Sequence, residues 1–585
     1  MKKCPQCGRE YDLSMGFCLD DGVELLYGPG LSEPPASAGG QFDGGPATAI
    51  IPANDVPGEA ATRAQINTTG QTAVLPTDAS NAPKAKRFDK RRVFAPVALA
   101  VIILGGFIGY RYVTQAKQIE SIAVMPFVNE SGNADVEYLS DGMTETLISS
   151  LSNIPNLAVK ARSTVFYYKG KETSAKKIGE ELKVQAVLFG RVSQRGDDLK
   201  LSLELVNTET QDVIWSEQYS RKQSGLVALQ SEIAKTISDK LRSKLTATEQ
   251  ERVSKTNTTS SEAQQLYLKG RFHWNKRNTA DFQKAREYFQ QAIAADPNYA
   301  LAHTGLADTL ALMPYYGNFR PSEYMPLAKQ AAQKALEIDP NLAEAHASLG
   351  QILTNYDYDF KGAERELKRA IELDPKYPSA YQWLSEVYHC LGNGDQALSE
   401  INKALEIDPL SMIINNQKGR AIDFGGKRDE AVAQFKKTIE LFPDAPSPRN
   451  NIADVYEAKD MYPEAVEQRL IQIKLLFGVS PENIKDLQLA FEKDGYKGFV
   501  QKQIDIQLDS QRSSLEKDKN AYLPAFRIAV DYARLGDKDK AFEYLNKAYD
   551  QREPHIAELK IRLPLSSLRD DPRFNELVRK VGFPE

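Results

Sequence analysis

Residues Asp374–Pro409 read DPKYPSAYQWLSEVYHCLGNGDQALSEINKALEIDP. The small residues Ser385 and Ala397 lie ten and twenty-two residues after Pro375, and larger apolar residues such as Tyr388 lie among them. Small residues at fixed positions let two helices approach closely, and the proline at the end of such a unit cannot continue a helix. The stretch therefore predicts a pair of packed helices closed by a turn.

The same pattern recurs through residues 262–475, where successive boundary prolines are separated by 43, 35, 34 and 34 residues. These prolines are Pro297, Pro340, Pro375, Pro409 and Pro443, and the small residues ten positions later are Ala307, Gly350, Ser385, Gly419 and Ala453. This spacing resembles the tetratricopeptide repeat. The resemblance implies an all-α superhelix whose concave face binds proteins or peptides.

Residues 476–585 continue the array less regularly. The pattern is degenerate over 480–515, a final repeat fits at Ala529–Ala548, and Leu563–Leu577 looks like a short capping helix pair, as repeat arrays require. A longer insert, Pro314–Tyr324, separates the first two repeats, and we expect it to form a loop.

Residues 119–246 carry a different pattern. Strands are predicted at 121–128, 157–161, 186–194, 199–205 and 212–219, because short apolar runs or strict alternation fill them. Helices are predicted at 138–151, after Ser174 and at 226–245, where leucines and isoleucines recur every three or four residues. The order predicts an α+β domain in which one sheet packs against helices.

This segment resembles the TolB amino-terminal-like domain over about 125 residues, from IAVMPFVNESG at residue 122 to IWSEQYSR at residue 214. Asp141, Gly142, Thr144 and Glu145 match that family's Asp-Gly-x-Thr-Glu segment. Two interpretations stay open for them. Either Ser140 or Asp141 caps the start of the helix and Glu145 lies in its first turn, or these residues form a ligand site.

Residues 93–113 predict one transmembrane helix, because Val93–Tyr110 contains no charged residue and is close to the length that spans a bilayer. Six basic residues lie at 84–92, and few follow the span. The positive-inside rule then places the N-terminus in the cytoplasm and the C-terminal domains in the periplasm of a bacterial inner membrane. Residues 27–92, rich in Gly and Pro, predict a disordered linker that ends in a basic juxtamembrane stretch.

Three of the four cysteines lie within residues 1–26. Cys4 and Cys7 form a C-x-x-C knuckle followed by glycine, and Cys18 and Asp21 repeat this spacing before Gly22. We expect a structural zinc ribbon with ligands Cys4, Cys7, Cys18 and Asp21, since Zn²⁺ accepts carboxylate oxygen as a fourth ligand. Asp20 or a water could complete the site instead, and a metal-free remnant or redox chemistry are the alternatives.

The composition excludes few functions, but the net charge of −5 does not favour nucleic-acid binding. The sequence contains no Walker loop, H-E-x-x-H or G-x-S-x-G motif, so we expect no enzyme. The predicted chain is thus multidomain: zinc ribbon, transmembrane helix, α+β domain and repeat superhelix. We expect a membrane-anchored adaptor that binds protein partners; the alternative is a one-component transmembrane receptor that signals to the cytoplasmic ribbon.

Overall fold

The computed structural model describes residues 119–241, 257–477 and 480–583, together with three short strands near the N-terminus. The chain divides into two compact units, residues 1–101 and 102–585, and each is described by itself. In the first unit, strands β1 (Lys2–Lys3), β2 (Glu10–Tyr11) and β3 (Leu26–Tyr27) form an antiparallel sheet in the order β2-β1-β3. The predicted zinc ligands, the transmembrane segment and, apart from Tyr27, the linker lie outside the described residues. Among the helices that the structure does describe, none combines the length and apolar character needed to cross a bilayer.

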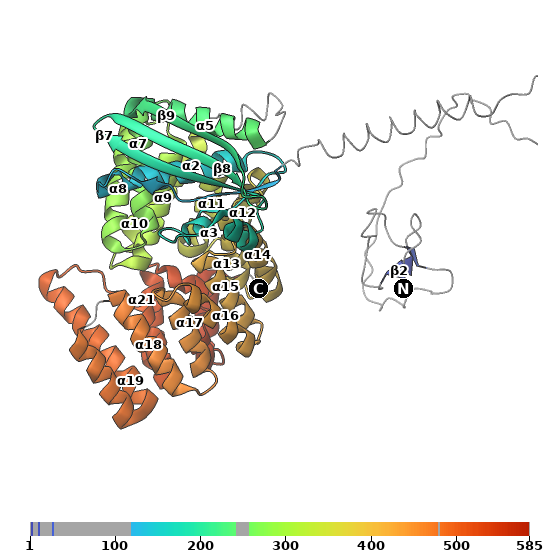
Figure 1. Cartoon of the computed structure of the whole chain (residues 1–585). Helices are drawn as coiled ribbons and strands as arrows, with labels where there is room; N and C mark the ends of the chain where they lie inside the picture. Colours follow the sequence, from blue (N-terminus) through green and yellow to red (C-terminus); the bar gives the residue numbers. More distant parts are fainter. Residues whose placement is uncertain are drawn as a thin grey trace, which may run out of the picture. The chain divides into compact units, whose positions relative to one another are not determined.

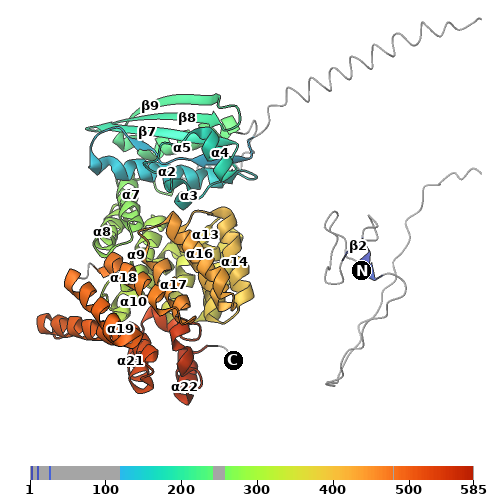
Figure 2. The same cartoon turned by 60° about the horizontal axis from the view of Figure 1, so that its bottom comes forward.

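The second unit begins with a sheet domain, seen with the repeat array in Figures 1 and 2. Its sheet has the order β6-β4-β7-β8-β9, with β5 paired to β7. Strand β4 runs parallel to β6 and β7, whereas β7, β8 and β9 form an antiparallel meander. The strands are β4 (Ser121–Val124), β5 (Val128–Asn129), β6 (Ala158–Val159), β7 (Ala186–Arg195), β8 (Asp198–Asn207) and β9 (Val213–Lys222).

Helices cover one face of this sheet. The helical elements are η1 (Ala134–Val136), α2 (Glu137–Ser152), α3 (Arg162–Phe166), α4 (Ala175–Leu182), η2 (Gln223–Gly225) and α5 (Leu226–Leu241). The predicted stripe of α2, namely Leu139, Met143, Leu147 and Leu151, is fully buried. The alternation predicted for β8 is also confirmed, because its odd-numbered leucines are buried while the residues between them are not. The sequence did not reveal α3 or β5.

Paired helices build the repeat array over residues 261–477, which confirms the predicted all-helical superhelix. In the first five pairs the second helix ends just before the Asp-Pro or Phe-Pro boundary, as predicted. The pairs are α7 (Ser261–Asn275) with α8 (Thr279–Ala295), α9 (Ala300–Tyr316) with α10 (Pro321–Ile338), α11 (Ala343–Ile352) with α12 (Phe360–Leu373), α13 (Pro378–Cys390) with α14 (Gly394–Ile407), α15 (Met412–Phe424) with α16 (Arg428–Leu441), and α17 (Pro446–Glu457) with α18 (Tyr462–Phe477).

The small residues allow the two helices of a pair to pack closely, because a larger side chain at these positions would overlap the partner helix. A Cβ atom placed on Gly419 would lie 2.4 Å from the ring of Phe435, and one on Gly350 would lie 2.6 Å from Leu367 Cγ. Both partner side chains are buried, so neither can move aside without opening a cavity. The period that identified the repeat therefore marks the closest approach of its two helices.

One expectation about the array is wrong. The insert 314–324 is mostly helical rather than a loop: Pro314 lies inside the last turn of α9, and α10 already begins at Pro321. A proline at the first position of a helix loses no hydrogen bond, and this favours the early start of α10. A short π-helical turn, η3 (Leu353–Asp357), extends α11 in the next unit.

The C-terminal part closes the array. Element α19 (Pro481–Lys517) covers the degenerate stretch and consists of two helices joined at Gly495, whose φ of 63° breaks the helix. Helices α20 (Phe526–Leu535) and α21 (Lys538–Asp550) form the predicted final repeat. The predicted capping pair consists of the 3₁₀ turn η5 (Leu563–Leu568) and helix α22 (Pro572–Val581); a further 3₁₀ turn, η4 (Pro554–Glu558), precedes them.

Candidate functional site

A cavity of about 2590 Å³ follows the inner side of the array. The first helix of every unit from α7 to α17 contributes to its lining. Helices α2, α3 and α5 of the sheet domain also line it, together with α18, α19, α20 and η4. The cavity is thus lined by segments that lie far apart in the sequence, and we call it the channel.

A row of amide side chains lies along this channel. Seven and eight residues after successive boundary prolines stand Gln382, Asn416, Gln417, Asn450 and Asn451, and all of them line the cavity. The Asn451 side chain donates to Asn416 Oδ1 at 3.0 Å, and Gln417 donates to the backbone oxygen of Gln382 at 3.3 Å. Each amide group offers both a donor and an acceptor. The row therefore provides a repeated hydrogen-bonding surface at the period of the repeats.

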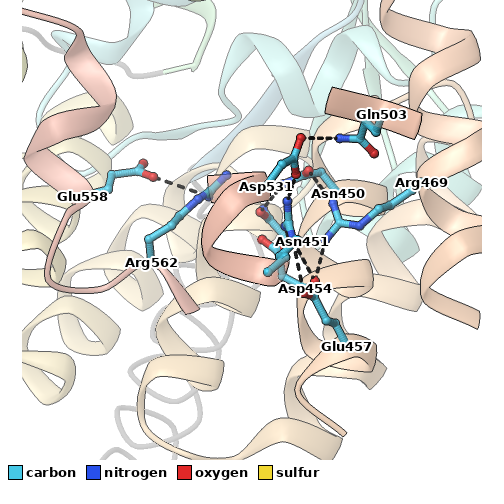
Figure 3. A network of polar contacts seen from close by, with 10 residues as sticks. Asn450, Asn451, Asp454, Glu457, Arg469, Gln503, Asp531, Glu558 and Arg562 are labelled. Atoms are coloured by element: carbon cyan, nitrogen blue, oxygen red, sulfur yellow. Dashed lines mark hydrogen bonds and ion pairs between the residues drawn. The ribbon is translucent and has the colours of Figure 1, made fainter. Parts of the chain in front are cut away.

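An ion network beside the amide row fixes the C-terminal wall (Figure 3). Arg469 of α18 contacts Asp454 at 2.5 Å and Glu457 at 2.9 Å, both on α17. Arg534 of α20 reaches the same Asp454 at 2.7 Å and also Asp531 at 2.6 Å. Burial opposes ionisation of Asp454, but the two guanidinium groups outweigh it and hold its pKa below the usual range. The network joins α17, α18 and α20 across a gap of about eighty residues of chain.

A second buried contact brings η4 to the channel. Glu558 pairs with Arg420 of α15 at 2.8 Å and with Arg562 at 3.4 Å. Burial opposes its ionisation, yet Arg420 and Arg562 lower the pKa of this carboxyl group strongly. Glu386, on the neighbouring unit, lines the same part of the channel, where burial and the charge of Glu558 raise its pKa to about 7.

The sheet domain forms one wall of the channel through Glu145 on α2. Its carboxylate accepts from Arg162 at 2.9 Å and pairs with Arg271 of the first repeat at 2.8 Å. Burial opposes ionisation of Glu145, but these arginines hold its pKa below the ordinary value. Glu145 therefore links the two domains and lines the cavity.

The helix-start interpretation of the 140–145 segment is wrong. Helix α2 begins at Glu137, so Ser140 and Asp141 lie inside it, and both are buried. Asp141 does not face the channel but pairs with Lys169 at 2.5 Å. Of the matched residues, only Glu145 lines the channel, so the four do not converge on one site.

Two further polar contacts attach the sheet domain to the array. Lys376, between α12 and α13, donates to the carbonyl oxygens of Ser152, Ile154 and Leu157 at 2.9, 3.1 and 2.9 Å. Asp408, between α14 and α15, accepts hydrogen bonds from the hydroxyl groups of Ser163 and Thr164. Its side chain is buried, and this burial raises its pKa.

The predicted metal ligands Cys4, Cys7, Cys18 and Asp21 lie outside the described residues and stay a prediction. Within residues 119–241, 257–477 and 480–583, no group of histidine, cysteine and carboxylate side chains could hold a metal ion. The fourth cysteine, Cys390, is buried at the end of α13, as expected of a small apolar residue. The amide row was missed, although the same proline period that revealed the repeats would have located it.

Comparison with known proteins supports the repeats and gives a different relative for the sheet domain. Two tetratricopeptide repeat models match residues 274–312 and 356–412. The second domain of HilA/YgeH-like transcriptional regulators matches residues 117–236. That match spans most of the predicted α+β domain, and the resemblance to the TolB amino-terminal-like domain stays a prediction.

One curated relative is a protein of Rhizobium meliloti (strain 1021) named "Putative adenylate cyclase 3", 35% identical over 187 residues. The alignment covers 32% of this chain and 32% of the relative, so the chain spans about a third of that protein's length.

Among solved structures, YrrB, described as a TPR protein with an unusual peptide-binding site, is 22% identical over 32% of this chain and 91% of its own, with a TM-score of 0.24. TTC0263, a thermophilic TPR protein of Thermus thermophilus, is 20% identical over 33% of this chain and 99% of its own, with a TM-score of 0.29. These superpositions are too partial to carry an argument.

Proposed function

We propose that the chain is a protein-binding scaffold whose channel holds an extended peptide segment of a partner. The amide row carries this proposal, because an extended backbone offers donors and acceptors at short regular intervals and amide side chains can pair with both. The ion networks at the channel walls support it, since a preorganised site does not have to order its own side chains on binding.

The proposal extends to the segments predicted from sequence alone. The scaffold is anchored in the inner membrane of a bacterium by residues 93–113, with a cytoplasmic zinc ribbon and a periplasmic channel. The basic stretch at 84–92 supports this orientation. In this proposal the chain acts by binding and is not an enzyme; nucleic acid is not a partner.

Peptide binding can be tested by substituting the amide row in the full-length chain. We expect Asn416→Ala combined with Asn450→Ala to weaken capture of peptides from a random extended-peptide array at least about tenfold, because each net hydrogen bond contributes roughly 1 kcal/mol. Asn575→Ala provides a matched control, because Asn575 is exposed on α22 and does not line the channel. Peptide capture that survives loss of both channel amides would exclude the amide row as the binding surface.

A second candidate is a transmembrane regulator that passes a signal to the cytoplasmic ribbon. The match of residues 117–236 to a domain of HilA/YgeH-like transcriptional regulators favours it. A reporter screen separates the two candidates: deletion of residues 1–26 should abolish a transcriptional response in a regulator, and should leave partner capture intact in a scaffold. Because one relative is named "Putative adenylate cyclase 3", cyclic AMP formation by the purified full-length chain should be measured in a separate assay, and activity there would contradict the proposal that the chain is not an enzyme.

A further inference from the structure

Strand β9 (Val213–Lys222) forms the outer edge of the six-stranded sheet, and only its inner side is paired. Figure 2 shows it at the margin of the sheet domain, opposite the repeat array. Among the residues that the structure describes, no strand pairs with its outer side. At ten residues it is long for an edge strand, and such edges are templates for pairing with another chain.

The backbone groups that point outward can be identified from the register. Gln223 donates its N–H to the carbonyl of Asp197 at 2.8 Å, so residue 223 faces β8. Successive residues of a strand direct their N–H and C=O groups to opposite sides. The even-numbered residues Ser216, Gln218 and Ser220 therefore present unpaired backbone groups along the outer edge.

Two features that usually block an edge, a proline and a central bulge, are missing from β9, whereas charged side chains are present at Glu217, Arg221 and Lys222. It contains no proline, and its single bulge lies at the far end, where the pairing shifts at Leu205 and Val206 of β8. Val213 and Ile214 are exposed to 53% and 37%, which places two of the large exposed apolar side chains of the described residues on this strand.

The charges on β9 are complementary to those of a second copy. If two β9 strands pair antiparallel about a two-fold axis at Tyr219, residue 217 of one copy lies opposite residue 221 of the other. Glu217 then faces Arg221 twice, once on each side of the axis. In the same register Ser216 pairs with residue 222 and Gln218 with residue 220, so the outward backbone groups meet each other. Two-fold axes at residues 217, 218 or 220 do not bring Glu217 opposite Arg221.

We propose that β9 is an interface between two copies of this chain, which pair edge to edge about Tyr219 and extend the sheet across both subunits. Backbone hydrogen bonds supply the contact, and the Glu217–Arg221 pairs select its register. Arg221 already contacts Glu232 of its own chain at 3.1 Å, but both side chains are nearly half exposed and this pair can rearrange. The interface lies on the sheet domain and leaves the channel open.

A charge exchange tests this interface directly. The full-length chain in detergent is studied by sedimentation velocity over a range of concentrations, as wild type, as Glu217→Arg, as Arg221→Glu and as the double exchange. We expect a wild-type dimer. Each single substitution should weaken dimerisation about ten- to hundredfold, because two favourable pairs become two repulsive ones, and the double exchange should restore it.

The control is Glu204→Arg on β8, an equal change of charge on an inner strand of the same sheet, which should leave the dimer unchanged. Circular dichroism checks that every variant is folded. A monomeric wild type, a dimer that persists in both single variants, or a double exchange that stays monomeric overturns the assignment of β9 as the interface.

Discussion

The attachment of the sheet domain to the repeats depends strongly on one ammonium group, and Lys376→Met tests it. Lys376 donates to three carbonyl oxygens at 2.9–3.1 Å, and the first of them, that of Ser152, belongs to the last residue of α2. A positive charge at a helix C-terminus adds to these bonds. Methionine keeps the apolar stem of the side chain but removes every donor.

The expected loss follows from these contacts. A hydrogen bond from a charged group contributes about 1.5–3 kcal/mol. The three bonds share one charge and Lys376 is only half-buried, so they do not add in full and water can replace part of them. We expect the contact to weaken by about 2–3 kcal/mol, which increases the population of the detached state about 30- to 150-fold.

Hydrogen exchange of the full-length chain measures this change locally. In Lys376→Met, the amides around residues 152–160 should exchange faster by about that factor, while α20 and α21 keep their protection. Lys403→Met is the matched control, because Lys403 is exposed and its ammonium group pairs with Glu400 of its own helix. Protection at residues 152–160 that stays within about threefold of the wild type would refute the view that Lys376 holds the two domains together.

Three further outcomes follow from the packing and charge of the array. Gly419→Val should destabilise the chain by about 2–3 kcal/mol in chemical denaturation, because its side chain would overlap the ring of Phe435, and an unchanged midpoint would disprove the close approach. Arg469→Met should cost about 3–5 kcal/mol by the same assay, since it removes one of the two guanidinium groups that neutralise the buried Asp454; a loss below about 1 kcal/mol would show that the network is dispensable. The pKa of Glu386 is about 7 in the folded state and 4.5 in the unfolded state, so the folded state binds the proton more tightly. The stability of the chain should therefore fall as the pH rises from about 5 to 7. The free energy of unfolding of the Glu386→Gln variant should therefore match that of the wild type at pH 5 and exceed it by roughly 2–3 kcal/mol at pH 8. If the variant and the wild type are equally stable at pH 8 as well as at pH 5, the raised pKa is contradicted.

The repeats could be predicted from the sequence because their packing constraint is local. A small residue is needed wherever the two helices of one unit touch, and this requirement returns at intervals of 43, 35, 34 and 34 residues. The strands of the meander were equally predictable, since β8 buries alternate leucines. In both cases the residues that make the contact are close in the chain, so the pattern is visible within one window.

The contacts that shape the channel could not be predicted in this way. Glu145 meets Arg271 across more than a hundred residues, and Asp454 meets Arg534 across eighty. Charged residues on a helix surface look the same whether they face solvent or a distant partner. The apolar stripe placed the start of α2 at Tyr138, one residue from its observed start at Glu137. The capping interpretation of Ser140 and Asp141 failed because Tyr138 and Leu139 are buried in the core, so the helix already includes the residues before them.

The boundary aspartates show how one repeated residue can acquire a separate role. Asp296, Asp339 and Asp374 each accept a hydrogen bond from the backbone N–H two residues later, a local turn that fits their place before proline. At the next boundary the hydroxyl group of Thr164 lies between the carboxylate of Asp408 and the backbone N–H of Leu410. This hydroxyl donates to Asp408 and accepts from the N–H of Leu410 at 3.1 Å. At this boundary the Thr164 hydroxyl of the sheet domain bridges the aspartate and the N–H two residues later, in place of the direct hydrogen bond of the other boundaries. Because the sequence at this boundary still reads Asp-Pro, the periodicity that reveals the repeats also hides a boundary aspartate that binds the neighbouring sheet domain.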